Sequence, residues 1–328
     1  MKTLIKLANS TKIEGIGGFI LFEGNAARAT DATMHAVIES GPWNFDCATL
    51  VSVQQIKTAM TLAKKPVWSG DTLNGIKLVS AGTTDWPMLP DVRQAKRIVT
   101  DNLSASILQC APAMADRDIR YYLNGMLFDH TERVIVGCDG HRLHLVHNAF
   151  ASELTGQTIV PRDAIDLAGV KNILHMDFTD KYVRVGYVGG YIVAQLCDGK
   201  FPDYSRVLPD AKSRPNVVAF NGKHTDAVKT ICSVNKANKA KYQTIAIDAD
   251  GSLNACDVKL PCFDQFKVTR LNDKNGLPTG QDFYGINANY LHDAMLSAHE
   301  GTIGVDTAND SILVINGDFR AVVMPCRV

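Results

Sequence analysis

Three short segments of the chain share one layout, which limits the folds that the chain can adopt. Each begins with a β-branched residue typical of a strand end, and a residue that favours a helix start follows directly. Serine and asparagine cap exposed N–H groups, while proline loses no needed hydrogen bond at the first helical position. Apolar residues five and eight positions after the first predict a helical face packed on a sheet. The segments are 51–60, 160–169 and 286–295.

A second block of sequence precedes each segment and lengthens the repeat. It has the pattern of a short helix, a polar or glycine-rich loop and an aromatic-rich strand. Proline-containing stretches at 86–90 and 201–209 close the first two units. The residue before a proline is pushed to extended geometry, so these stretches predict strands that end in linkers. The copies of the block are 4–10 with 19–22, 104–113 with 121–128, and 226–234 with 242–247.

Repeats more than 100 residues apart indicate three similar domains and not a solenoid of short units. We place the domains at 1–90, 91–210 and 211–328, with the first visibly shorter at its N-terminus. Alternating strands such as 182–187 accompany the helix patterns, so we expect an α+β fold with two helices on antiparallel sheets in each domain. A chain of 328 residues is also too long for one ordinary core.

The charge of the chain is balanced, with 34 basic and 34 acidic residues. No global field steers it onto nucleic acid or membrane, so any DNA contact comes from local patches or does not depend on tight binding. Lys6 interrupts the apolar N-terminus, and no stretch approaches the roughly 20 apolar residues of a transmembrane helix. We therefore expect a soluble, cytoplasmic protein with no membrane partner.

The cysteines of the chain show no C-x-x-C pair, and several lie near apolar residues, as Cys110 does after Leu108. This usage is typical of buried, reduced thiols and not of a disulfide framework or a zinc site. The eight cysteines are Cys47, Cys110, Cys138, Cys197, Cys232, Cys256, Cys262 and Cys326.

Two local motifs suggest a metal or phosphate site, but their context argues against both. On a helix His141, His144 and His147 would share a face, yet the apolar residues between them and the preceding Asp-Gly turn predict a strand, on which His144 faces away. The glycine-rich 15–18 lacks the Lys-Ser/Thr of a phosphate loop and precedes a strand. With no nucleophile or paired-carboxylate motif, we expect no enzyme, no catalytic residue, no metal and no cofactor.

The last seven residues, 322–328, form an apolar strand that runs into the C-terminus. Chain ends usually fray unless something ties them down. Such an end is either a buried edge strand or part of a pocket wall.

Five segments give the chain a recognisable relative. They are 118–126, 139–143, 159–162, 201–209 and 323–328. In this order they resemble the middle domain and the C-terminus of the bacterial DNA polymerase III beta subunit, the beta sliding clamp. The resemblance implies three similar clamp domains per chain and a homodimer that closes head to tail into a ring. It also implies that the ring encircles duplex DNA regardless of sequence, is placed there by a clamp loader, and tethers a DNA polymerase during replication.

The resemblance further implies an apolar pocket between the middle and last domains, which takes a short partner peptide rich in Leu and Phe. Apolar side chains would form the cavity, and Arg and His at its rim could fix the peptide backbone. Two positions, Cys138 and Cys326, depart from the residues expected in this family, so the preferred peptide can differ. The residues carried over are Arg120, Leu123, Cys138, Gly140, His141, Arg142, Leu143, Pro202, Arg206, Val207, Tyr242, Asn287, Tyr290, Val322, Val323, Met324, Pro325, Cys326 and Arg327.

Family positions also suggest cations that face DNA, namely Arg117, Arg162 and, by repeat symmetry, Lys57. A basic run at 223–241 is either a solvated helix face or a border of the DNA channel. Two other hypotheses stay open. A clamp-derived adaptor would bind peptides as a monomer without closing a ring. A metal-dependent hydrolase built on Asp139 and the histidines is disfavoured by the strand pattern and would show metal-dependent turnover.

Overall fold

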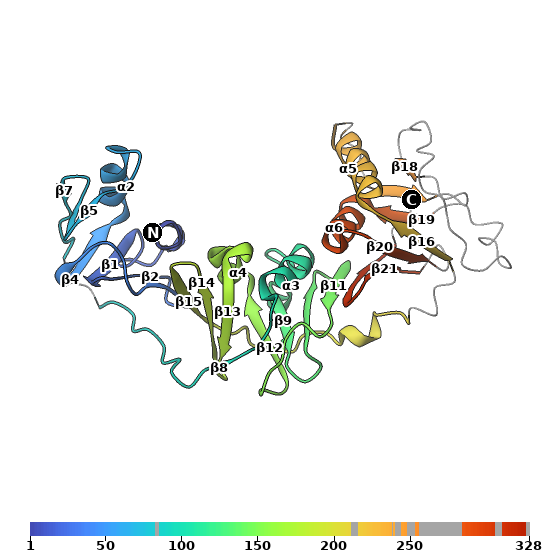
Figure 1. Cartoon of the computed structure of the whole chain (residues 1–328), viewed down its shortest axis with the longest axis horizontal. Helices are drawn as coiled ribbons and strands as arrows, with labels where there is room; N and C mark the ends of the chain where they lie inside the picture. Colours follow the sequence, from blue (N-terminus) through green and yellow to red (C-terminus); the bar gives the residue numbers. More distant parts are fainter. Residues whose placement is uncertain are drawn as a thin grey trace. The chain divides into compact units, whose positions relative to one another are not determined.

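The computed structural model describes residues 1–82, 85–210, 216–237, 239, 244–247, 253–255, 284–305 and 310–325 (Figure 1). The chain divides into two compact units, Met1–Ser104 with Ala151–Cys197 and Ala105–Phe150 with Asp198–Val328. Each unit joins part of the predicted middle domain to one end of the chain. The division into three domains at 1–90, 91–210 and 211–328 stays a prediction.

The first unit is built on an antiparallel sheet with the strand order β4-β1-β2-β3-β15-β14-β13-β8. The N-terminal and central segments share this sheet because β3 pairs with β15, with Val37 opposite Tyr191. Its strands are β1 (Phe19–Gly24), β2 (Ala26–Thr30), β3 (Met34–Ile38), β4 (Phe45–Ser52), β8 (Lys96–Arg97), β13 (Ile173–Phe178), β14 (Tyr182–Tyr187) and β15 (Gly190–Gln195). The unit also holds α1 (Lys2–Ser10), α2 (Val53–Thr61), α4 (Arg162–Ala168), η3 (Val170–Asn172), β12 (Gln157–Pro161) and a small sheet of β5 (Trp68–Ser69), β6 (Thr72–Leu73) and β7 (Ile76–Lys77).

The second unit repeats this plan. Its main sheet contains the order β9-β10-β11-β22-β21-β20-β16, joined where β11 pairs antiparallel with β22. Its strands are β9 (Gly125–Asp129), β10 (Val134–Cys138), β11 (Arg142–Val146), β16 (Asn216–Phe220), β20 (Gly301–Val305), β21 (Ile312–Asn316) and β22 (Phe319–Val323). A smaller sheet contains β17 (Thr244–Ile247), β18 (Leu253–Ala255) and β19 (Tyr284–Asn287), and the helices are α3 (Leu103–Cys110), η1 (Ala111–Ala113), η2 (Tyr121–Leu123), η4 (Tyr204–Arg206), α5 (Gly222–Ala237) and α6 (Ala288–Ala298). Figure 1 shows α5 and α6 side by side on this unit.

The three predicted strand-to-helix segments are confirmed as β4–α2, β12–α4 and β19–α6. Ser52 accepts a hydrogen bond from the Gln55 N–H at 3.2 Å, and Asn287 accepts from the N–H of Tyr290 at 3.3 Å. Pro161 differs from the prediction, because it ends β12 and the helix begins at Arg162. The predicted apolar pairs all lie in the core, as expected for a helical face packed on a sheet: Ile56 and Ala59, Ile165 and Ala168, Leu291 and Ala294.

Other predicted elements differ in extent. The aromatic strand expected over 121–128 starts only at Gly125, because 121–123 form a 3-10 turn. The Asn124 side chain closes that turn by bonding both the N–H and the carbonyl of Asp118, each at 2.8 Å. The stretch 85–90 carries neither helix nor strand, and 201–209 carries only the 3-10 turn η4, so the strands expected at these prolines are not found. Among the described residues, no helix combines the length and apolar character needed to cross a membrane.

Close packing fixes the end of α3 against β10 and β11. A Cβ atom at Gly137 would lie 2.3 Å from the Cys110 carbonyl oxygen, so only glycine allows this approach. From β11 the buried His144 places Nδ1 2.8 Å from the Gln109 carbonyl oxygen, and its ring packs edge-on against Phe319. The turn η1 that follows α3 is thereby held beside the start of β11.

Candidate functional site

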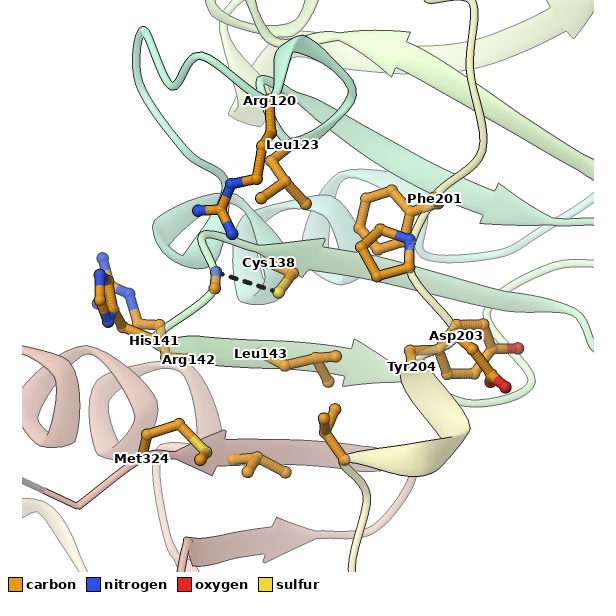
Figure 2. Close-up of a pocket in the computed structure, with 14 residues that line it drawn as sticks. Arg120, Leu123, Cys138, His141, Arg142, Leu143, Phe201, Asp203, Tyr204 and Met324 are labelled. Carbon is orange, nitrogen blue, oxygen red and sulfur yellow. Dashed lines mark hydrogen bonds between the residues drawn. The ribbon is translucent and has the colours of Figure 1, made fainter.

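A cavity of about 210 Å³ opens in the second unit where β11 and β22 meet. It is smaller than the roughly 300–1,000 Å³ of sites for drug-sized ligands, and it suits a few apolar side chains of a longer partner. Figure 2 shows the lining side chains converging from the turn before β9, from the β10–β11 turn, from the segment after residue 200 and from the end of β22. They are Arg120, Leu123, Cys138, Gly140, His141, Arg142, Leu143, Phe201, Pro202, Asp203, Tyr204, Val207, Val322 and Met324.

Strand register decides which C-terminal residues reach the cavity. Leu143 lies opposite Val322, and the Met324 N–H extends the ladder by donating to the His141 carbonyl at 3.0 Å. Successive side chains of a strand point to opposite faces. Val322 and Met324 therefore line the cavity, while Val323 between them is fully buried and does not line it. β22 pairs with β11 on one side and β21 on the other, so the described chain end is an interior strand and not the edge strand of the first alternative, and Val322 and Met324 make it part of the pocket wall.

The tight turn between β10 and β11 forms one rim of the cavity. Asp139 Oδ1 accepts hydrogen bonds from the N–H groups of His141 at 2.8 Å and Arg142 at 3.0 Å. Gly140 has a φ of +88°, which favours glycine, and a Cβ there would lie 2.8 Å from the Arg120 guanidinium and displace that side chain. Its N–H donates to Cys138 Sγ (Figure 2). Burial raises the pKa of the Cys138 thiol, so the pocket holds it as a neutral, weakly polar group.

Arg120 lies above this turn with its charge already paired. Its Nε and Nη2 donate to the Asp118 carboxylate at 3.0 and 2.7 Å, and Nη2 also donates to the Asp139 carbonyl at 3.1 Å. These hydrogen bonds lower the pKa of Asp118 to about 2. Arg120 therefore lines the cavity with a guanidinium whose charge is balanced by Asp118. The neighbouring Leu123 adds a fully buried apolar side chain to the lining.

The opposite wall is an aromatic segment that the sequence prediction covered only in part. Phe201 is buried, and the Tyr204 hydroxyl donates to Asp129 Oδ2 at 3.2 Å, which holds the segment against β9. Burial, together with the nearby Asp129 carboxylate, raises the pKa of Tyr204. Phe201, Asp203 and Tyr204 all belong to the motif that carried the resemblance, from which only the neighbouring Pro202, Arg206 and Val207 had been selected.

Some predicted residues lie beside the cavity without lining it. Arg206 is largely exposed and pairs with Asp203 at 3.0 Å. Pro325 forms an isolated bridge with Ile286, which brings the chain end next to Asn287 at the start of α6. The Tyr290 ring lies beneath Arg142, whose Cζ is 4.3 Å from the ring centroid. Tyr242, Cys326 and Arg327 lie outside the described residues.

The segment with the three histidines contains a strand, as predicted: His144 lies in β11, while His141 directly precedes the strand and His147 directly follows it. His144 is fully buried and burial lowers its pKa to about 4, whereas His141 is exposed at the rim. Within the described residues, no group of three His, Cys, Asp or Glu side chains is arranged to hold a metal ion.

The predicted DNA-facing cations are all on described elements. Arg117 is exposed in the loop before η2 and lies 4.0 Å from Asp116. Arg162 opens α4 and pairs with Asp166 at 3.2 Å, and Lys57 is exposed on α2. In the basic run, Lys223, Lys229, Lys236 and Lys239 are exposed on or just after α5, and Lys241 lies outside the described residues.

The described cysteines are all free thiols. Cys110 is buried, and Cys138, Cys197 and Cys232 are half-buried, as expected for structural cysteines. Cys47 on β4 differs, since its side chain is exposed. Cys256, Cys262 and Cys326 fall outside the described part of the chain.

Comparison with known proteins gives one consistent family. Residues 97–203 match the family model of the DNA polymerase III beta subunit, central domain. The beta sliding clamp of Pseudomonas aeruginosa is 30% identical over 242 residues, which are 66% of this chain and 61% of that protein. The beta sliding clamp of Proteus mirabilis is 41% identical over 108 residues, 30% of this chain and only 29% of that protein. The sequence matches therefore span less than two thirds of these relatives.

Solved structures extend the likeness in fold to the full chain. A DNA polymerase sliding clamp from Pseudomonas aeruginosa, solved with a ligand, has a TM-score of 0.74 at 22% identity, covering 100% of this chain and 96% of that one. A sliding clamp from Caulobacter crescentus has a TM-score of 0.75 at 20% identity, with the same coverage. At these identities the structures establish the fold, which is α+β with repeated clamp-like domains and antiparallel sheets, as predicted.

Proposed function

This chain belongs to the family of the bacterial DNA polymerase III beta subunit, the beta sliding clamp, and we propose that it is a processivity factor which encircles duplex DNA and tethers a DNA polymerase. The family consists of non-enzymatic replication proteins, in agreement with the prediction that the chain is not an enzyme. The observation that carries the proposal is the apolar cavity at the β11–β22 junction, lined by residues from four of the five segments of the resemblance, namely 118–126, 139–143, 201–209 and 323–328.

Encirclement accounts for the neutral charge of the chain. Strong DNA binding through phosphates needs many basic contacts and falls steeply with salt. A closed ring is held by topology, and a formal net charge of zero leaves it free to slide. We assign the ring to two copies of the chain, joined head to tail and placed on DNA by a clamp loader in the cytoplasm. Arg117, Arg162 and Lys57 are the proposed DNA-facing cations.

Tethering requires a second contact, which we assign to the cavity. Its lining is apolar apart from paired charges, and its volume of about 210 Å³ suits the Leu and Phe side chains of a short partner peptide. A polymerase held on its template in this way gains a high effective concentration at the primer end without any new active site. Asn287, Tyr290 and the chain end through Arg327 complete the proposed peptide site.

The alternative is an adaptor that binds peptides but does not close a ring. The short first domain favours it, since in a head-to-tail ring that domain would carry half of each subunit interface. Negative-stain electron microscopy with a solution mass distinguishes the two. Closed rings at dimer mass support the clamp, and curved single particles at monomer mass that still bind peptide support the adaptor.

A further inference from the structure

We propose that Asp293 on α6 is a positioning residue of the peptide site, which fixes the Arg142 guanidinium and through it the Tyr290 ring. The inference rests on the proposed peptide-binding function of the cavity. Asp293 does not line the cavity. The inference also changes the role of Arg142, which was expected to bind the peptide backbone and is here assigned to holding parts of the site together.

Each of the three guanidinium nitrogens of Arg142 contacts a different partner. Nε pairs with Asp139 Oδ2 at 3.2 Å, Nη1 donates to Asp293 Oδ2, and Nη2 donates to the Pro112 carbonyl. These partners belong to the turn before β11, to α6 and to η1. A planar guanidinium with a fixed fork of donors is suited to such a junction. With a partner at each of its three nitrogens and its side chain only 11% exposed, Arg142 is poorly placed to pair with a peptide.

The guanidinium group of Arg142 also packs against Tyr290 and fixes the position of its ring. The guanidinium carbon lies 4.3 Å from the ring centroid, a cation–π contact. The ring also lies near parallel to the His141 ring, with centroids 6.3 Å apart and planes inclined by 20°. Tyr290 is thus held beside the exposed rim of the cavity, next to His141 and Arg142.

Asp293 differs from Asp139 in what its carboxylate does. Asp139 already serves two N–H groups of its own turn, so its position is fixed without Arg142. Asp293 is part of α6, three residues after Tyr290 and hence on the same helical face. Among the described residues it is the carboxylate that links Arg142 to α6. Its other oxygen lies 3.8 Å from His292 Nδ1.

Loss of Asp293 would therefore release both the guanidinium and the ring. A partly buried cation that loses one partner moves toward water or another acceptor. We expect Asp293→Asn, which keeps the shape but removes the charge, to weaken peptide binding by about tenfold. Asp226→Asn, at an exposed position on the neighbouring helix α5, is the matched control and should leave affinity unchanged.

The test measures fluorescence polarisation with a labelled peptide Ser-Leu-Ser-Leu-Phe-Gly and the full chain, with thermal unfolding to confirm that each variant is folded. A double-mutant cycle separates positioning from general support. If Asp293 acts through the Tyr290 ring, Asp293→Asn should have less than about a twofold effect in a Tyr290→Leu background, which removes the aromatic ring but keeps an apolar side chain so that binding can still be measured. Full, additive losses, or unchanged affinity of the folded Asp293→Asn chain, would overturn the inference.

A crystal structure of Asp293→Asn gives a readout that does not depend on the peptide. The guanidinium and the Tyr290 ring should both leave the places described above, and an unmoved ring would overturn the inference. Absence of peptide binding by the unaltered chain, in contrast, would refute the proposed function of the cavity while the crystal structure still decides the role of Asp293.

Discussion

Contacts between individual side chains fix the shape of the cavity. Among these residues, we expect Tyr290 to contribute most to peptide binding. Its ring is anchored by Arg142 and lies beside His141 at the exposed rim. An aromatic ring fixed on one face presents its remaining surface to a partner at little entropic cost. Aromatic anchors of this kind dominate the energy of many interfaces.

Tyr290→Ala should abolish measurable peptide binding while leaving the assembly intact, because the ring contributes to the rim and not to the core. Deletion of 324–328 should have the same effect, since Met324 lines the cavity. Peptide titration with a parallel solution mass tests both variants, with Tyr182→Ala on β14 as control. Unchanged affinity in a folded Tyr290→Ala chain would contradict the assignment.

Tyr204→Phe addresses the opposite wall. The substitution removes the hydrogen bond to Asp129 and keeps the ring. Asp129 Oδ1 keeps its hydrogen bonds from the N–H groups of Thr131 and Glu132, so the turn after β9 should persist. A lost hydrogen bond of this kind is worth about 1 kcal/mol, which predicts a severalfold loss of peptide affinity. Equal affinity of the variant and the unaltered chain would mean that packing of Phe201 alone holds the wall.

The wall formed by Phe201 and Tyr204 also shows why residue-level prediction was incomplete. The motif was visible in the sequence, but the contact that turns Tyr204 toward β9 joins residues 75 positions apart. Asp293 was missed for the same reason, since its partner Arg142 is 151 positions away. The local signal for Asp293 was its position three residues after Tyr290, which places both residues on the same face of a helix.

At the scale of elements, local sequence patterns predicted where helices start but did not predict which strands pair in the sheets. Ser52 and Asn287 cap helices as predicted, because a cap is decided within four residues. The pairing of β3 with β15 and of β11 with β22 joins distant repeats into single sheets, and no local pattern specified it. The cavity could be approached only through the resemblance, because it is formed by the second of these junctions.

Ser52→Ala should lower the free energy of unfolding by about 1 kcal/mol, since the cap hydrogen bond to Gln55 is lost. The corresponding Pro161 makes no side-chain cap, so Pro161→Ala should not show this cap loss. Urea unfolding of the two variants compares them directly. A Ser52→Ala chain as stable as the parent would show that packing alone fixes the start of α2.

A second prediction at this scale concerns how the stability contributed by Asp177 depends on pH. The buried Asp177 on β13 receives Arg97 from β8 and Arg184 from β14, at 2.6 and 2.8 Å. Burial raises the pKa of this carboxyl, but the hydrogen bonds and charges of the two arginines outweigh burial and lower it overall. A depressed folded-state pKa gives stability that is complete above the unfolded value of about 3.9 and is lost as pH falls through the folded value.

The stability difference between the unaltered chain and Asp177→Asn should therefore be full at pH 7 and shrink below about pH 4. Urea midpoints across this range measure it, with exposed Asp46→Asn as the control that removes a carboxyl without partners of this kind. A difference that stays constant down to the acid end would contradict the assignment of the shift to the two arginines.

At the scale of the whole molecule, the proposed ring makes a prediction that affinity alone cannot imitate. A protein held by phosphate contacts leaves DNA as salt rises, whether the DNA is circular or linear. A ring held by topology leaves only where the duplex has an end. With 34 basic and 34 acidic residues, this chain has no charge surplus to hold it by the first route.

Chains assembled on nicked circular DNA with a bacterial clamp loader should remain bound through gel filtration at raised salt. Cutting the same DNA with a restriction enzyme should release them, because a neutral ring slides off the new ends. Retention is measured from radiolabelled protein that coelutes with DNA before and after cutting. Equal retention on circular and linear DNA would refute encirclement, whereas failure to be retained on either, with peptide binding intact, is the result expected of the adaptor.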